Sequence, residues 1–228
     1  MTKIDWSDET INPLGHGCYG TGTKEKPAIC EYCYAAKMAK RNMRGCDLCG
    51  KFIPHAHFEQ LDKLRMWKKS KTVFIQSMGD LFGDWVPDEW IKKVFNACNE
   101  NPQHRYLFLT KNPKKQSNYS VEFTHDKKWA GITITNQKDL DTNYKYLRNY
   151  SFYSIEPLQE KINFTDRLIA DWLIIGAETG NRKDKIIPER KWIENIVNYC
   201  KKTNVPVFMK KNLKEIWNEL LIQQFPWQ

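Results

Sequence analysis

Short apolar runs alternate with amphipathic stretches along most of this 228-residue chain. From residue 72 onward, runs rich in β-branched and aromatic residues each end in polar or small side chains, and stretches with helical spacing of apolar residues separate several of them. We expect strands at 72–77, 105–110, 129–135, 151–155, 171–176 and 205–209, with a further strand near 4–12. Helices are expected near 60–69, 88–95, 138–148 and 189–202.

Repeated alternation of strand and helix is typical of parallel strands joined by crossover helices. The strand runs are apolar on both faces, as expected when helices cover a parallel sheet. About seven strands in a chain of this length predict an α/β fold, a complete or partial TIM-type (βα) barrel, with a doubly wound open sheet as the alternative. No linker or low-complexity tract divides the sequence, so we expect one barrel domain over residues 1–228.

Polar side chains follow directly after several of the expected strands. Asp80, Asn136, Glu156 and Glu178 occupy such positions, and the carboxyl ends of parallel strands build the active sites of α/β folds. Asp and Asn also form turns and helix caps, which accounts for part of this pattern. Glu is a poor turn former and is costly to bury unpaired. Glu156 and Glu178 are therefore the stronger functional candidates.

Three cysteines near the start of the chain are candidate ligands. Cys18, Cys30 and Cys33 are approached by a glycine-rich segment and followed at once by a helix-like run. Three thiolates on one loop after the first strand can hold a metal or an iron–sulfur cluster and leave one coordination position free. A zinc site completed by His16 or by a later cysteine is the alternative.

A second group of metal-ligand types follows closely. Cys46, Cys49, His55 and His57 supply two thiolates and two imidazoles, which match the ligand set of tetrahedral Zn²⁺. We expect a zinc knuckle inserted at about 44–58. Reduced cysteines without a metal, or participation of Cys46 or Cys49 in an iron–sulfur cluster, are the alternatives.

The charge balance favours an anionic partner. A formal net charge of +9 is typical of proteins that bind nucleic acid, nucleotides or phosphate, although a lysine-rich solvated surface gives the same balance. No stretch resembles a signal peptide or a membrane span, so we expect a cytoplasmic protein with reduced thiols and no membrane partner. The basic residues expected on the active face are Arg41, Arg44, Lys51, Lys111, Lys114, Lys115, Arg182, Lys210 and Lys211.

Several stretches resemble a known group of proteins. The run Cys-Glu-Tyr-Cys-Tyr from Cys30 resembles the cluster loop of radical S-adenosylmethionine (SAM) enzymes. More closely, the chain resembles the phage- and bacterium-associated three-cysteine-motif proteins related to that superfamily. The similar stretches follow the same order across nearly the whole chain: 4–8, 12–13, 30–35, 77–82, 109–113, 156–158 and 175–180.

This resemblance implies an enzyme with a [4Fe–4S] cluster on Cys18, Cys30 and Cys33 and with SAM on the fourth iron. One electron from an external donor would cleave SAM to methionine and a 5′-deoxyadenosyl radical, which would act on an unknown substrate, with a nucleotide or nucleic acid as the candidate. The spacing departs from the familiar CxxxCxxC, because eleven residues separate the first two cysteines. That gap can still close, since it spans up to ~40 Å when extended.

The resemblance also implies roles for residues near the cluster. Tyr32 matches an aromatic that packs near the adenine, and residues 77–80, with Ser77 and Asp80, match the segment beside the methionyl end. The strand at 174–178 is loosely similar to the adenine-contacting strand. Asp80 and the other polar strand-end residues would line the SAM and substrate pocket: Asn136, Glu156 and Glu178.

A second hypothesis comes from a different class of protein. A zinc-stabilised, basic protein that binds nucleic acid without catalysis would explain the charge and the second group of ligands. A hydrolase is less favoured, because the acidic residues have no recognisable metal-binding spacing.

Overall fold

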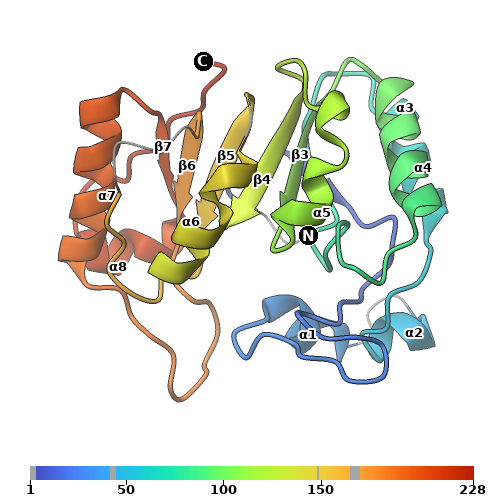
Figure 1. Ribbon diagram of the computed structural model, residues 1–228, viewed down its shortest axis with the longest axis horizontal. Coiled ribbons are helices and arrows are strands. Elements are labelled where there is room, and N and C mark those ends of the chain that lie inside the picture. The colour runs from blue at the N-terminus through green and yellow to red at the C-terminus, as the bar shows by residue number, and fades with distance from the viewer. Residues whose placement is uncertain (1–3, 42–44, 148, 165–169) are drawn as a thin grey trace.

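Seven parallel strands form a single curved sheet in the computed structural model, which describes residues 4–41, 45–147, 149–164 and 170–228 (Figure 1). Each strand pairs with the next one along the chain, so the spatial order is β1 to β7. The strands are β1 (Glu9–Ile11), β2 (Thr72–Ile75), β3 (Arg105–Thr110), β4 (Lys128–Thr133), β5 (Ser151–Ile155), β6 (Trp172–Ile175) and β7 (Val207–Met209). This arrangement is a half-barrel of the TIM type, which confirms the predicted α/β class. The doubly wound alternative is wrong, because the strand order never reverses.

The longer helices lie on the outer face of the sheet, whereas α1 and α2 lie at one of its ends (Figure 1). The α-helices are α1 (Tyr34–Ala39), α2 (Asp47–Gly50), α3 (Asp62–Met66), α4 (Asp88–Asn99), α5 (Pro113–Ser117), α6 (Gln137–Asn143), α7 (Arg190–Thr203) and α8 (Lys214–Trp217). Short 3₁₀ helices are η1 (Phe58–Leu61), η2 (Ser120–Glu122), η3 (Tyr144–Tyr146) and η4 (Lys211–Leu213). Among the residues that the structure describes, no helix has the length and apolar character needed to cross a bilayer.

Alternate residues of each strand pack on opposite faces of the sheet. In β2, Val73 and Ile75 join the outer core, which α4 covers with Ile91 and Val94, whereas Phe74 points to the inner face. This double burial explains why the strand runs are apolar without alternation.

The inner face of the half-barrel is an aromatic layer. Its buried aromatic members come from six segments of the chain: Trp6, Phe74, Trp129, Phe152, Trp172 and Phe208. Gly131 makes room for this layer, because a Cβ there would lie 2.2 Å from the Phe152 ring. The C-terminal segment closes the layer through Phe225 and Trp227. The tryptophans of the inner layer are therefore buried and are not available as stacking platforms for bases.

Candidate active site at the carboxyl ends of the strands

The loop that leads to Cys18 is fastened to the carboxyl end of β2. Gly17 forms a parallel bridge with Gly79, and the Gly17 amide donates to the Met78 carbonyl at 3.0 Å. A Cβ on Gly79 would lie 2.3 Å from the Gly17 carbonyl oxygen, so this close approach requires glycine. The first cysteine is thereby held at the edge of the sheet where a (βα) barrel carries its active site.

The eleven-residue gap between Cys18 and Cys30 folds back on itself. Gly20 adopts φ +67° and bridges to Ala28, while the Ala28 amide donates to the Tyr19 carbonyl at 2.9 Å. A Cβ on Gly20 would lie 1.9 Å from the Ala28 oxygen. Residues 19–28 therefore form a closed loop, and the two cysteines flank its base.

Each of the three sulfurs accepts one N–H group from the protein. The Gly20 amide donates to Cys18 Sγ at 3.2 Å, and the Ala36 amide donates to Cys33 Sγ at 3.4 Å, which makes Cys33 the N-cap of α1. Lys111 Nζ donates to Cys30 Sγ at 3.4 Å. Hydrogen bonds to sulfur stabilise thiolate charge and are one means by which proteins tune iron–sulfur clusters.

Cys18 lies within electrostatic range of the other two thiols and of Asp80. Burial raises the pKa of Cys18 to about 12, and the nearby acidic groups Asp80, Cys33 and Cys30 add to this effect. Several anionic groups within mutual range become favourable when a cationic centre compensates them. The chemistry of this donor set therefore suits a multivalent metal centre.

Asp80 joins the loop after β2 to the carboxyl end of β3. Its carboxylate accepts from Thr110 Oγ1 at 2.7 and 2.9 Å and from the Lys111 amide at 2.9 Å. Burial raises the pKa of this carboxyl, although the hydrogen bonds oppose the shift. Lys111 in turn reaches the Tyr32 hydroxyl at 2.9 Å. Asp80 thus positions the lysine that contacts both Cys30 and Tyr32.

Ser77 ties the ends of β1 and β2 to α1. Its hydroxyl accepts from Thr10 at 2.8 Å and donates to Asn12 Oδ1 at 3.2 Å, and its carbonyl accepts from the Tyr34 hydroxyl at 2.5 Å. Asn12 also accepts from the Met78 amide at 2.8 Å. Asn12 is not among the predicted site residues, although its position just after β1 was the available signal.

Glu178 is paired rather than free. Its side chain is 1% exposed, and it accepts two hydrogen bonds from Arg182, both at 2.8 Å. These hydrogen bonds hold the pKa of Glu178 below its ordinary value, and Lys37 and Lys185 act in the same direction. Arg182 also lies 3.5 Å from Glu31, so this pair connects the loop after β6 with the cysteine loop.

Glu156 forms an ion pair with Lys210, which joins the ends of β5 and β7. Gly176, at the end of β6, lies between them, and a Cβ there would approach the Glu156 carboxyl at 3.1 Å. Burial raises the pKa of Tyr34, and the negative charges of Glu156 and Cys33 raise it further. Glu156 and Cys33 are therefore both close enough to the Tyr34 hydroxyl to influence its pKa.

The remaining predicted residues are Asn136 and the basic side chains. Asn136 caps α6 by accepting from the Asp139 amide at 2.8 Å, so its contact with a cofactor stays a prediction. Among the predicted basic residues, Lys111, Arg182 and Lys210 take part in the contacts above. Arg44 lies outside the described residues.

Two surface hollows lie away from this region. They have volumes of about 560 and 490 Å³ and are lined by residues at the amino ends of the strands, among them Arg105, Asp171 and Val205. Neither is lined by a predicted site residue. We therefore place the candidate site at the opposite end of the sheet.

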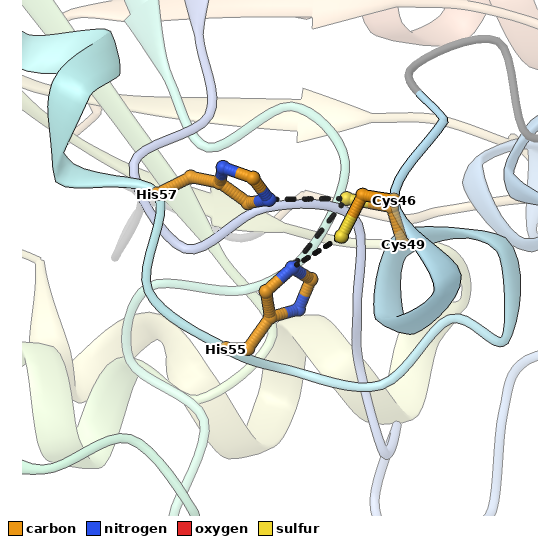
Figure 2. Close-up of side chains that lie close together, drawn as sticks. All are labelled: Cys46, Cys49, His55 and His57. Carbon is orange, nitrogen blue, oxygen red and sulfur yellow. Dashed lines mark hydrogen bonds between the residues drawn. The ribbon is translucent and has the colours of Figure 1, made fainter.

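The residues of the second predicted ligand group also lie close together. The ligand atoms of Cys46, Cys49, His55 and His57 all lie within 4.8 Å of one another, and Figure 2 shows both rings turned toward the sulfurs. His55 Nε2 lies 3.3 Å from Cys46 Sγ and 3.6 Å from Cys49 Sγ, while His57 Nε2 lies 3.6 Å from Cys49 Sγ. The four residues form a group that can hold a metal ion.

Comparison with known families covers almost all of the chain. Residues 1–219 match the family model described as "Protein of unknown function (DUF5131)". The chain belongs to this family. No curated protein matches it.

The fold is similar to that of a solved structure, spore photoproduct lyase complexed with dinucleoside spore photoproduct. The TM-score is 0.52 at 10% sequence identity, and the similarity covers 87% of this chain and 75% of the lyase. At this identity the similarity concerns the fold, namely the partial barrel whose strand ends carry the site described above.

Proposed function

We propose that this protein is a radical SAM-like enzyme whose [4Fe–4S] cluster is held by Cys18, Cys30 and Cys33. The observation that carries the proposal is the loop at the carboxyl end of the half-barrel, where each of the three sulfurs accepts one N–H donor. Three thiolates leave the fourth iron available to a small ligand. When bound, the cluster would supply one electron for cleavage of SAM to methionine and a 5′-deoxyadenosyl radical.

The chain's own residues support such a centre in distinct ways. Lys111 brings a positive charge and an N–H donor to Cys30, and Asp80 holds its backbone in place. Hydrogen bonds and charge near cluster sulfurs set the reduction potential. The Glu156–Lys210 pair provides polar and charged groups at the same edge for binding SAM and substrate.

We further propose a nucleotide or nucleic-acid substrate. The net charge of +9 and the fold similarity to a lyase in complex with a dinucleoside both favour this class. Lys111 supplies positive charge next to the cysteine loop, whereas Arg182 and Lys210 are already paired with carboxylates there. An oligonucleotide should therefore bind with an affinity that falls as salt concentration rises.

The decisive experiment is anaerobic reconstitution followed by iron and sulfide analysis. We expect about four iron and four sulfide per chain, a broad visible absorption, and 5′-deoxyadenosine when SAM and a reductant are added. Cys30→Ala should lose the cluster, whereas Cys98→Ala, a matched change in α4 remote from the loop, should keep it. A protein that takes up only zinc and never forms 5′-deoxyadenosine would refute the proposal.

A second candidate function is non-catalytic nucleic-acid binding by a zinc-stabilised basic protein. The assembled Cys46–His57 group and the net charge favour it. It predicts salt-dependent binding by a colourless protein that contains zinc but no iron. The visible spectrum of anaerobically purified protein separates the two functions.

A further inference from the structure

We propose that Cys46, Cys49, His55 and His57 bind one structural Zn²⁺ ion, and that this ion clamps residues 13–18, the segment that ends at Cys18. The ligand set shares no residue with the three-cysteine loop. The inference therefore stands or falls independently of the proposed enzymatic function.

The separations between the ligand atoms fit a single tetrahedral ion. Zinc bonds of about 2.3 Å to sulfur and about 2.0–2.1 Å to nitrogen place neighbouring S and N ligands about 3.6 Å apart. The structure has S···N separations of 3.3, 3.6 and 3.6 Å (Figure 2). Two thiolates also neutralise the charge of the ion. Thiolate and imidazole ligands in a tetrahedral arrangement are typical of zinc.

Both imidazoles are held in the orientation that a metal site requires. His55 Nδ1 lies 2.6 Å from the Ile53 carbonyl, and His57 Nδ1 lies 2.5 Å from the Glu59 carboxylate. Because a carbonyl and a carboxylate accept hydrogen bonds, each Nδ1 is placed to donate to its partner, which leaves Nε2, the ring nitrogen that faces the sulfurs, as the atom available to a metal. A carboxylate or carbonyl behind a ligating histidine is the usual outer shell of a metal site.

The backbone around the ligands is adapted to them as well. Gly15 adopts φ +61°, and a Cβ there would lie 2.7 Å from His55 and 2.8 Å from His57. The His16 amide donates to Cys49 Sγ at 3.4 Å. The segment before Cys18 therefore forms one wall of the ligand group.

Two hydrogen bonds and one close backbone approach join the ligand segment to residues 13–18. The His57 amide donates to the Pro13 carbonyl at 2.7 Å, and the Cys18 amide donates to the Phe52 carbonyl at 3.4 Å. A Cβ on Gly17 would lie 2.3 Å from Pro54 N. The ligand segment contains one four-residue helix, α2, so it has little regular structure of its own to keep it folded. A bound metal supplies that stability in small irregular segments.

The first test measures the metal in the full-length protein purified anaerobically. We expect about one zinc per chain, and after exchange into Co²⁺ the visible bands of a tetrahedral site with a thiolate charge-transfer band. His57→Gln should lose the metal, whereas His125→Gln, a matched change outside the group, should retain it. Cys18→Ser should keep zinc whatever happens to its iron content, which separates this site from the cluster proposal.

A variant that changes a residue behind a ligand, and no ligand itself, distinguishes weaker metal binding from a folding defect. Glu59→Gln keeps all four ligands but weakens the partner of His57 Nδ1, so zinc affinity should fall about 10–100-fold. Glu89→Gln, at an exposed position in α4, should leave the affinity unchanged. Wild-type protein without zinc or a tetrahedral Co²⁺ spectrum would overturn the metal site. Equal affinities for these two variants would instead refute the role of Glu59 behind His57.

The second test addresses the clamp by hydrogen exchange in wild-type protein with and without a zinc chelator. Removal of the ion should accelerate exchange at the amides of Gly17, Cys18 and His57 and leave α7 unchanged. This comparison requires no variant, so a folding defect cannot obscure it. Loss of zinc without faster exchange at these amides would refute the clamp while leaving the metal site intact.

Discussion

The Gly15→Ala substitution tests the zinc site through sterics alone. The new methyl group would meet both imidazoles at 2.7 and 2.8 Å, distances that force at least one ring to move. The backbone at this position, with φ +61°, also disfavours any residue other than glycine. Gly45 provides the matched control, because it has φ +64° but no atom within 4 Å of its hypothetical Cβ.

Comparison of the two variants separates the stability cost of backbone strain from the stability cost of the steric clash with the imidazole rings. An alanine in the left-handed region costs about 1 kcal/mol, and this cost applies to both positions. Overpacking against rings fixed by a metal adds about 1–3 kcal/mol at Gly15 alone. We therefore expect a loss of about 2–4 kcal/mol for Gly15→Ala and about 1 kcal/mol for Gly45→Ala. The unfolded-state effect of replacing glycine by alanine is common to both and cancels in the difference.

Urea unfolding of the zinc-loaded and chelated proteins is the assay. With zinc bound, the Gly15 variant should lose more stability than the Gly45 variant by the overpacking cost, and its zinc affinity should fall. After chelation the rings can turn away, so the two variants should become nearly equal. If the two variants lose equal stability with zinc bound, or if the excess persists unchanged without it, the reasoning about metal-fixed rings is refuted.

Two further predictions concern the barrel. The pKa of Glu178 lies below its ordinary value of 4.5 because Arg182 hydrogen-bonds to the carboxylate. The contribution of Glu178 to stability is therefore complete above pH 4.5 and is lost as pH falls through the lowered pKa. Arg182→Met leaves burial as the largest influence on this carboxyl and should raise its pKa. The free energy of unfolding should then fall as pH rises from about 5 to 7. Urea unfolding across this pH range checks the sign. Gly131→Ala places a methyl group 2.2 Å from the Phe152 ring and should cost about 1–3 kcal/mol. Phe152→Leu in the same chain should recover part of this loss in thermal unfolding, and a double variant no more stable than Gly131→Ala would contradict the packing argument.

Sequence patterns predicted the long elements well. The expected strands at 105–110 and 151–155 match β3 and β5 residue for residue, because apolar runs bounded by turn residues define them locally. The expected strand near 4–12 is shorter, with only Glu9–Ile11 paired. The expected helix at 60–69 is a 3₁₀ turn followed by α3, which ends at Met66. Both differences arise where tertiary contacts, rather than local periodicity, decide the ends of an element.

The candidate site could be predicted in its residue types but not in its pairings. Glu156 and Glu178 were singled out because an unpaired buried glutamate is costly, and the structure supplies each with a cation. Lys210 lies 54 positions from Glu156 in the sequence, so no local pattern indicates this pair. Asn136 illustrates the opposite case, because a helix-capping residue after a strand has the same sequence signature as an active-site residue.

The unusual spacing of the three cysteines has a physical explanation in the surrounding loops. A short CxxxCxxC loop would position its first sulfur by sequence proximity alone, whereas Cys18 is separated from Cys30 and must be positioned by other parts of the chain. Gly17 meets the loop after β2 on one side and residues 53–54 on the other. The segment around the Cys46–His57 group thus forms an outer wall that a shorter loop would not need. This arrangement predicts that loss of the outer wall displaces Cys18 before it affects Cys30 or Cys33.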